Sequence, residues 1–172
     1  DYFASPAGGD VLVKRAARYG LALVKSRLGA HDEALTILQQ LVSDYPDDLH
    51  YPLALAESHV AAGALRSALS PLRSARARWP DEPILYGAEA NVLIKIGDAA
   101  SAKPIIRAAL RLDNDSVALY RLLARAEGQL GNMAPSFQAL AEASYLEGEP
   151  TRALAELSRA EKHAGHSTYL AA

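Results

Sequence analysis

The chain has 172 residues, 50% of them hydrophobic, and a formal net charge of −2. This length is sufficient for a domain with a hydrophobic core, and the nearly neutral charge gives the whole molecule no strong attraction to nucleic acid or anionic membranes. The absence of cysteine excludes disulfides, thiolate zinc sites and a cysteine nucleophile. No run approaches the roughly 20 apolar residues that a membrane-spanning helix requires, so we expect no transmembrane segment.

Residues 1–10 contain one proline and two glycines and are predicted to form a flexible arm or linker. One domain is expected to occupy residues 11–172. Helical spacing of apolar residues predicts its first helix over 11–28 and a second over 32–43. Pro46 follows the second helix and marks the end of the first helical pair.

Two further helical pairs are predicted in the middle of the chain. The first of these covers 51–62 and 65–78, and the next covers 83–96 and 99–112. Pro71 falls inside an expected helix. Proline removes a hydrogen-bond donor and clashes with the preceding turn, so we expect a kink there.

A fixed interval of 34 residues links these pairs. Glycine recurs in the turn inside each pair, and alanine recurs seven residues before each glycine. These landmarks are Gly29, Gly63, Gly97 and Gly131, with Ala22, Ala56, Ala90 and Ala124. Small residues allow close helix crossings, and glycine ends a helix at low cost in a left-handed conformation.

The C-terminal part departs from this interval. Helices are predicted over 117–130 and 134–147, and a last helix from Pro150 to about Gly165. Gly148 follows Gly131 after only 17 residues, which is half the interval. We therefore expect the helix over 134–147 to serve twice, as the second helix of one pair and the first of the next.

A 34-residue period with small residues at fixed places resembles the tetratricopeptide repeat (TPR), a helix–turn–helix unit. The resemblance implies an all-α fold, a right-handed α-solenoid of TPR hairpins. About nine helices would form four repeats and a C-terminal half repeat. Such hairpins cannot bury their apolar faces alone, so each covers its neighbour.

The first helices of such an array line a concave groove, which we interpret as the binding surface for a protein or peptide partner. Repeat phase assigns ten side chains to it. They are Tyr19, Leu23, Arg27, His50, Leu53, Glu57, Asn91, Lys95, Arg121 and Arg125. The basic and asparagine residues of the carboxylate clamp found in chaperone-binding TPRs are not matched, since Tyr19, Leu23 and Ala54 stand at three of those places.

Arginines also crowd the helix expected over 65–78, at Arg66, Arg73, Arg76 and Arg78. They are interpreted as a solvated face, because the interleaved aromatic residues expected of a nucleic-acid-binding surface are missing. No nucleic-acid partner is predicted. The alternative is a patch for phosphate, a lipid headgroup or an acidic protein.

No motif for catalysis stands out. A His-Glu-x-x-His zinc motif, a phosphate-binding glycine loop and a Gly-x-Ser-x-Gly motif are all absent from the sequence. His163 and His166 lack a nearby third ligand and are interpreted as a solvated helix end. We therefore predict no cofactor, no metal site and no enzymatic activity. An enzyme that uses facing carboxylates among Glu57, Glu89 and Glu127 remains the alternative.

Three stretches carry a more specific resemblance: 18–23, 45–51 and 139–148. They resemble the C-terminal TPR region of bacterial BepA-type periplasmic zinc metalloproteases. This resemblance implies a non-catalytic region in the periplasm that acts in outer-membrane protein assembly and quality control. A preceding protease domain, outside this sequence, would alone hold zinc. The alternatives are a free-standing TPR adaptor in envelope, secretion or pilus assembly, and a cytoplasmic location.

Overall fold

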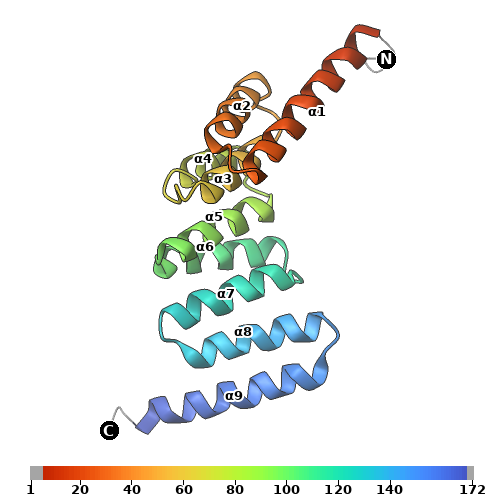
Figure 1. The fold of residues 1–172 in the computed structure, drawn as a ribbon. Coiled ribbons are helices and arrows are strands. Elements are labelled where there is room, and N and C mark those ends of the chain that lie inside the picture. Colours follow the sequence, from red (N-terminus) through yellow and green to blue (C-terminus); the bar gives the residue numbers. More distant parts are fainter. Residues whose placement is uncertain (1–5, 170–172) are drawn as a thin grey trace. The chain divides into compact units, whose positions relative to one another are not determined.

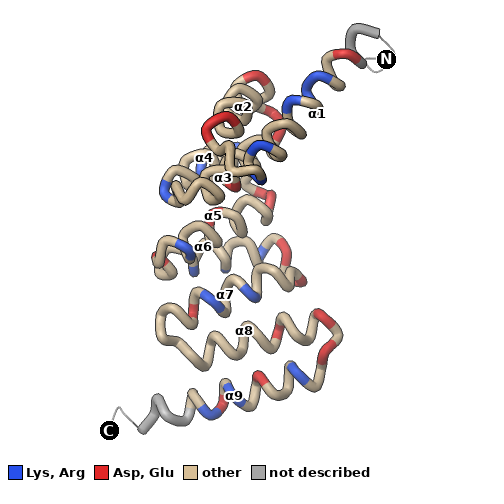
Figure 2. Tube along the Cα trace, in the orientation of Figure 1, with Lys and Arg blue, Asp and Glu red and all other residues tan. Residues whose placement is uncertain are grey.

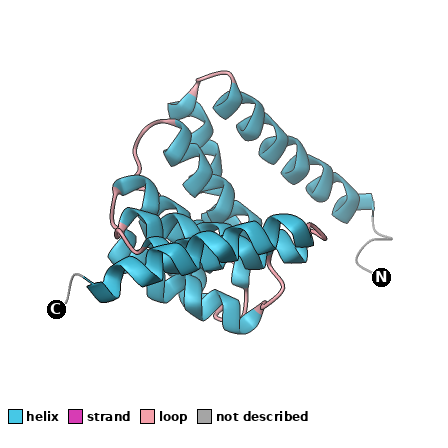
Figure 3. Ribbon diagram, turned by 90° about the horizontal axis from the view of Figure 1, so that it is seen from below, coloured by secondary structure: helices cyan, strands magenta, loops and turns pink. Residues whose placement is uncertain are grey.

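The computed structural model describes the backbone of residues 6–169 and the side chains of residues 10–164. Nine helices and no strand occur in the described backbone, as Figures 1 and 3 show. Within that range, no helix is both long enough and apolar enough to cross a membrane. The helices form two compact units, Asp1–Arg78 and Trp79–Ala172. The prediction of an all-α fold with about nine helices is confirmed.

The first unit contains α1 (Pro6–Arg27), α2 (His31–Asp44), α3 (His50–Ala61) and α4 (Leu69–Arg78). The helix expected from residue 11 starts at Pro6, because proline fits the first turn, where its missing N–H is not needed. Part of the predicted flexible arm is therefore helical, and its residues 1–5 lie outside the described residues. The core joins α1, α2 and α3 through Ala22, Leu38, Leu41, Tyr51, Ala54 and Leu55.

The helix α4 is shorter than the sequence predicted. A helix over 65–78 was expected to be kinked at Pro71, but the helix begins only at Leu69 and residues 65–68 form turns. This places Pro71 in the first turn, where no intrahelical hydrogen bond is lost. The predicted kink is replaced by a late helix start.

The second unit contains α5 (Pro83–Ile96), α6 (Ala99–Leu112), α7 (Val117–Gln129), α8 (Met133–Leu146) and α9 (Pro150–Tyr169). Successive helices pack on each other, and α5 also contacts α7. The helix α8 packs against both α7 and α9, as Figure 1 shows. This arrangement agrees with the double role expected for residues 134–147.

The landmark residues occupy the places that the interval predicted. All five turn glycines, including Gly148, have left-handed backbones with φ between 75° and 91°. The repeated alanines Ala22, Ala56, Ala90 and Ala124 are at most 3% exposed. At the α7–α8 crossing, a Cβ atom on Gly128 would lie 3.4 Å from Ser136 Oγ, so a small residue permits this close approach.

A buried ion pair joins α6 to α7. The Glu127 side chain is 2% exposed, and its carboxylate lies 2.9 Å from Lys103 Nζ and 3.7 Å from Arg107 Nη2. Asn132 Nδ2 donates a further hydrogen bond of 2.7 Å. Burial alone would raise the pKa of Glu127, but these hydrogen bonds and positive charges outweigh it and lower the pKa.

Substitution of Gly97 by alanine is expected to lower the free energy of unfolding by about 1 kcal/mol, because φ of 91° is strained for any residue with a Cβ atom. Gly20 is the matched control: it lies inside α1, and an added Cβ atom would meet nothing within 4 Å. Gly20→Ala should raise stability by about 0.5–1 kcal/mol, since alanine favours helix. Urea denaturation followed by circular dichroism measures both, and equal effects of one sign would contradict the assignment.

Candidate functional site

Six of the ten predicted binding residues lie in the first unit, on α1 and α3. Tyr19, Leu23 and Leu53 are half-buried, whereas Arg27, His50 and Glu57 are exposed. Tyr19 and Leu23 pack against the core cluster of α1, α2 and α3. Their apolar surface is therefore shared between the core and solvent, and only the exposed polar side chains are fully available to a partner.

Tyrosines and an arginine pack together beside these residues. The rings of Tyr19 and Tyr51 meet edge to face at 5.4 Å, and those of Tyr45 and Tyr51 lie 6.2 Å apart. The guanidinium carbon of Arg15 is 4.9 Å from the Tyr45 ring centre and 5.9 Å from that of Tyr51, within the range of cation–π attraction. Burial raises the pKa of Tyr19 and Tyr51, so both hydroxyls stay protonated at neutral pH.

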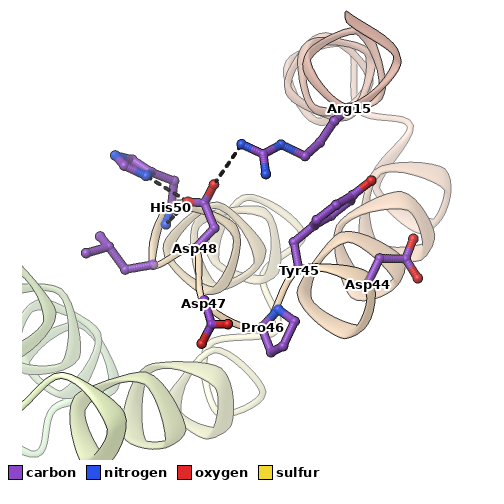
Figure 4. A pocket seen from close by; sticks show the side chains of 8 residues that line it. Arg15, Asp44, Tyr45, Pro46, Asp47, Asp48 and His50 are labelled. Atoms are coloured by element: carbon purple, nitrogen blue, oxygen red, sulfur yellow. Dashed lines mark hydrogen bonds and ion pairs between the residues drawn. The ribbon is translucent and has the colours of Figure 1, made fainter. Parts of the chain in front are cut away.

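Asp48 lies between Arg15 and His50, whose side chains approach it from opposite sides in Figure 4. Its Oδ2 is 3.7 Å from Arg15 Nη2, and its Oδ1 is 2.9 Å from His50 Nδ1. The backbone N–H of His50 also donates to Oδ1 at 3.1 Å. Burial would raise the pKa of Asp48, but the contacts with His50 and Arg15 together lower it, so the carboxylate is charged at neutral pH.

These side chains border an open cavity of about 540 Å³ at the α2–α3 turn, shown in Figure 4. Its lining residues are Arg15, Asp44, Tyr45, Pro46, Asp47, Asp48, Leu49 and His50. Asp44 pairs with Arg18 at 3.0 Å, and Asp47 accepts a hydrogen bond from Arg78. The cavity is thus polar, with its acidic side chains already paired to arginines.

Sequence reasoning identified only His50 of this cavity as a binding residue. Asp48 was missed because it lies in the turn between helices, whereas repeat phase selects positions within first helices. Arg15 was missed because its contact with Asp48 spans 33 residues of sequence. The signal that could have found the cavity is the stretch 45–51, in which two tyrosines flank two aspartates and a histidine.

The other four predicted residues lie in the second unit, on α5 and α7. Arg125 Nη1 donates a 3.3 Å hydrogen bond to Asn91 Oδ1, which joins equivalent positions of successive repeats. Arg121 Nη2 lies 2.5 Å from Oε1 of Glu147, an acidic residue after α8 that the sequence reasoning did not select. Lys95, Arg121 and Arg125 are exposed. Exposed ion pairs contribute little to stability, so these cations can exchange their contacts for a ligand at small cost.

Figure 2 shows how charge is distributed over the helices. Basic residues recur along α1 and α7, whereas α8 carries no lysine or arginine. The predicted set thus differs between the units: aromatic and mixed in the first, polar and basic in the second. Its role in binding stays a prediction.

The histidine pair near the C-terminus is only partly described. The His163 ring stacks on Phe137 with centroids 5.3 Å apart, while the His166 side chain lies outside the described residues. Among the described residues, no group of three or more histidines and carboxylates is placed to hold a metal ion. The buried carboxylate of Glu127 is held by cations, which gives it a structural part in the α6–α7 contact.

Comparison with known families and sequences gives two kinds of match. Tetratricopeptide-repeat family models match residues 16–48 and 84–116. The beta-barrel assembly-enhancing protease of Escherichia coli (strain K12) is 30% identical over 154 residues, and that of Yersinia pestis is 29% identical over 153 residues. The alignments cover 90% and 88% of this chain, which spans only 31% of the length of these relatives.

Solved structures with similar folds are also known. MamA (41-end) from Desulfovibrio magneticus RS-1 superposes with a TM-score of 0.68 and 16% identity, over 87% of this chain and 94% of that one. A thermophilic TPR protein from Thermus thermophilus superposes with a TM-score of 0.59 and 20% identity, over 88% and 92% of the two chains. At these identities the likeness concerns the fold alone.

Proposed function

We propose, from the premise that this chain is a tetratricopeptide-repeat protein, that its first-helix residues bind a protein or peptide partner. The premise rests on the repeat matches, on five left-handed glycines and on the related structures. A TPR array is an interaction scaffold, because packed helical hairpins hold side chains in place before a ligand arrives. This preorganisation lowers the entropy lost on binding.

The proposed partner surface consists of the ten residues selected by repeat phase. Support comes from the exposed polar side chains of α5 and α7, above all Lys95, Arg121 and Arg125. Arg125 is linked to Asn91 across one repeat, so two neighbouring first helices present their polar groups together. Extended or helical peptides are recognised by such rows of hydrogen-bonding groups.

The finer proposal is that the chain is the non-catalytic TPR region of a periplasmic zinc metalloprotease that acts in outer-membrane protein assembly. The single observation that supports it is 30% identity, over 90% of this chain, to a beta-barrel assembly-enhancing protease. In this proposal zinc belongs to a separate protease domain of the longer protein. The residues of this chain contribute recognition and hydrolyse nothing.

A free-standing TPR adaptor in envelope, secretion or pilus assembly is the second candidate. The repeat fold favours it as much as the first, because the fold alone does not specify a partner. The genomic reading frame distinguishes the two: a His-Glu-x-x-His protease domain encoded upstream supports the first candidate, and its absence supports the second. Peptidase activity of this chain alone would overturn both.

The double substitution Arg121→Glu with Arg125→Glu is expected to weaken binding at least about tenfold, because two cations of the proposed surface become anions. The probe is an unfolded outer-membrane β-barrel protein, and affinity is measured by fluorescence anisotropy. Helical circular dichroism and the melting temperature should stay nearly unchanged, since both arginines are exposed.

The matched control replaces two other exposed arginines of the second unit, Arg111→Glu with Arg152→Glu. Each double variant changes the formal net charge from −2 to −6, since every Arg→Glu substitution subtracts two charges. The control should bind the probe like the unmodified chain. Equal weakening in both variants would indicate a general charge effect and contradict the proposed surface.

A further inference from the structure

An apolar stripe on α1 is exposed to solvent. It consists of Ala17, Leu21 and Val24, which lie three and four residues apart on one side of the helix. Leu21 is 49% exposed and Val24 is 53% exposed. The opposite side of α1 carries Ala22, which is fully buried in the core with α2 and α3.

Repeat register shows what normally covers such a stripe. The equivalent residues on α3 are Tyr51, Leu55 and Ser58, which are 4%, 7% and 2% exposed. Tyr51 and Leu55 are buried in the core cluster with Leu38 and Leu41 of the preceding second helix, α2. The α7 equivalents Leu119 and Ala126 are likewise buried in a unit where α7 packs on α6.

The last helix, α9, has the complementary exposed surface. Register from Gly148 makes Leu154 and Leu157 the equivalents of Leu35 and Leu38 on α2. Leu38 is 0% exposed and Leu35 packs on the core cluster that contains the α3 residues. On α9, by contrast, Leu154 is 68% exposed and Leu157 is 44% exposed.

We propose that α9 of one copy of this chain covers the apolar stripe on α1 of a second copy. The contact would repeat between molecules the packing that α2 and α3 make within one, using residues in the same register. Leu154 and Leu157 of one copy would face Ala17, Leu21 and Val24 of the next. Because the two surfaces differ, the association is head-to-tail and continues beyond a dimer unless the geometry closes.

Sedimentation velocity of the 172-residue chain tests this proposal from about 1 µM to about 1 mM, the range of a weak interface. The weight-average mass of the unmodified chain should rise with concentration above the monomer mass of 18.3 kDa. Leu21→Glu and Leu154→Glu should each remain at 18.3 kDa, because each removes one of the two surfaces. Leu112→Glu, a 44% exposed leucine on α6, is the matched control and should assemble like the unmodified chain.

Mixing provides the decisive measurement. Each blocked variant keeps the surface that the other lacks, so equimolar Leu21→Glu and Leu154→Glu should form a dimer of twice 18.3 kDa and nothing larger. Circular dichroism establishes that both variants are folded. A chain that stays monomeric at every concentration, or a mixture that stays monomeric, would overturn the proposal and point to a different helix as the occupant. Dimers of either blocked variant alone would also overturn it, because they indicate a symmetric interface.

Discussion

Replacement of Leu38 by alanine is expected to lower the free energy of unfolding by about 2–5 kcal/mol. Leu38 is 0% exposed and lies in the cluster that joins α1, α2 and α3. Truncation removes apolar contacts and leaves a cavity that closely packed helices fill only partly. Urea denaturation followed by far-ultraviolet circular dichroism measures the change. A loss of this size is a large share of the stability of a typical domain.

Leu28→Ala is the control for this prediction, since it makes the same chemical change at a side chain that is 79% exposed. Its effect should stay within about 0.5 kcal/mol, as for most surface substitutions. If both variants lost the same stability, the core assigned to the first unit would be wrong. A large loss for Leu38→Ala alone supports the packing of repeats through their second-helix leucines.

Much of the fold could be predicted because the repeat imposes the same physical requirement several times. Each turn needs a left-handed residue, and glycine occupies all five places. Each crossing needs a small side chain, and Ala22, Ala56, Ala90 and Ala124 are buried there. The bounds of α5 and α6 agree with those predicted, since a proline, a glycine and an aspartate cap mark their ends.

The misses occur where a local feature competes with the repeat. Pro71 stands where the repeat predicts helix interior, and the backbone starts α4 two residues before it. Pro104 also lies within a predicted helix, yet α6 continues through it from Ala99 to Leu112. Two prolines in similar contexts thus had different outcomes. Periodicity alone does not weigh one lost hydrogen bond against the packing of the surrounding turns.

The candidate site was predictable in its helical positions and not in their partners. Repeat phase placed Asn91 and Arg125 together, and they form a hydrogen bond across one repeat. It did not select Asp48, Arg15 or Glu147, because contacts from turns depend on how the chain passes between helices. Such contacts join residues far apart in sequence and have no period of their own.

Glu127→Lys is expected to destabilise the second unit by about 3–5 kcal/mol, the cost of leaving a buried charge without its partner. The substitution places a third cation beside Lys103 and Arg107, which both contact the native carboxylate. It also removes the acceptor for Asn132 Nδ2. Thermal and urea denaturation measure the loss. Glu142→Lys is the matched control, because it makes the same charge change at an exposed position on α8.

The pH dependence of stability isolates the contribution of the charged carboxylate. The pKa of Glu127 is lower in the folded chain than its ordinary value of about 4.3. The folded state therefore binds fewer protons than the unfolded state, so this stabilisation is present above about pH 4.3 and is lost as the pH falls through the lowered pKa. Glu127→Gln, which keeps the side chain's shape but not its charge, should be less stable at neutral pH and lose less stability on acidification. An unchanged acid slope in that variant would show that Glu127 does not supply this pH dependence.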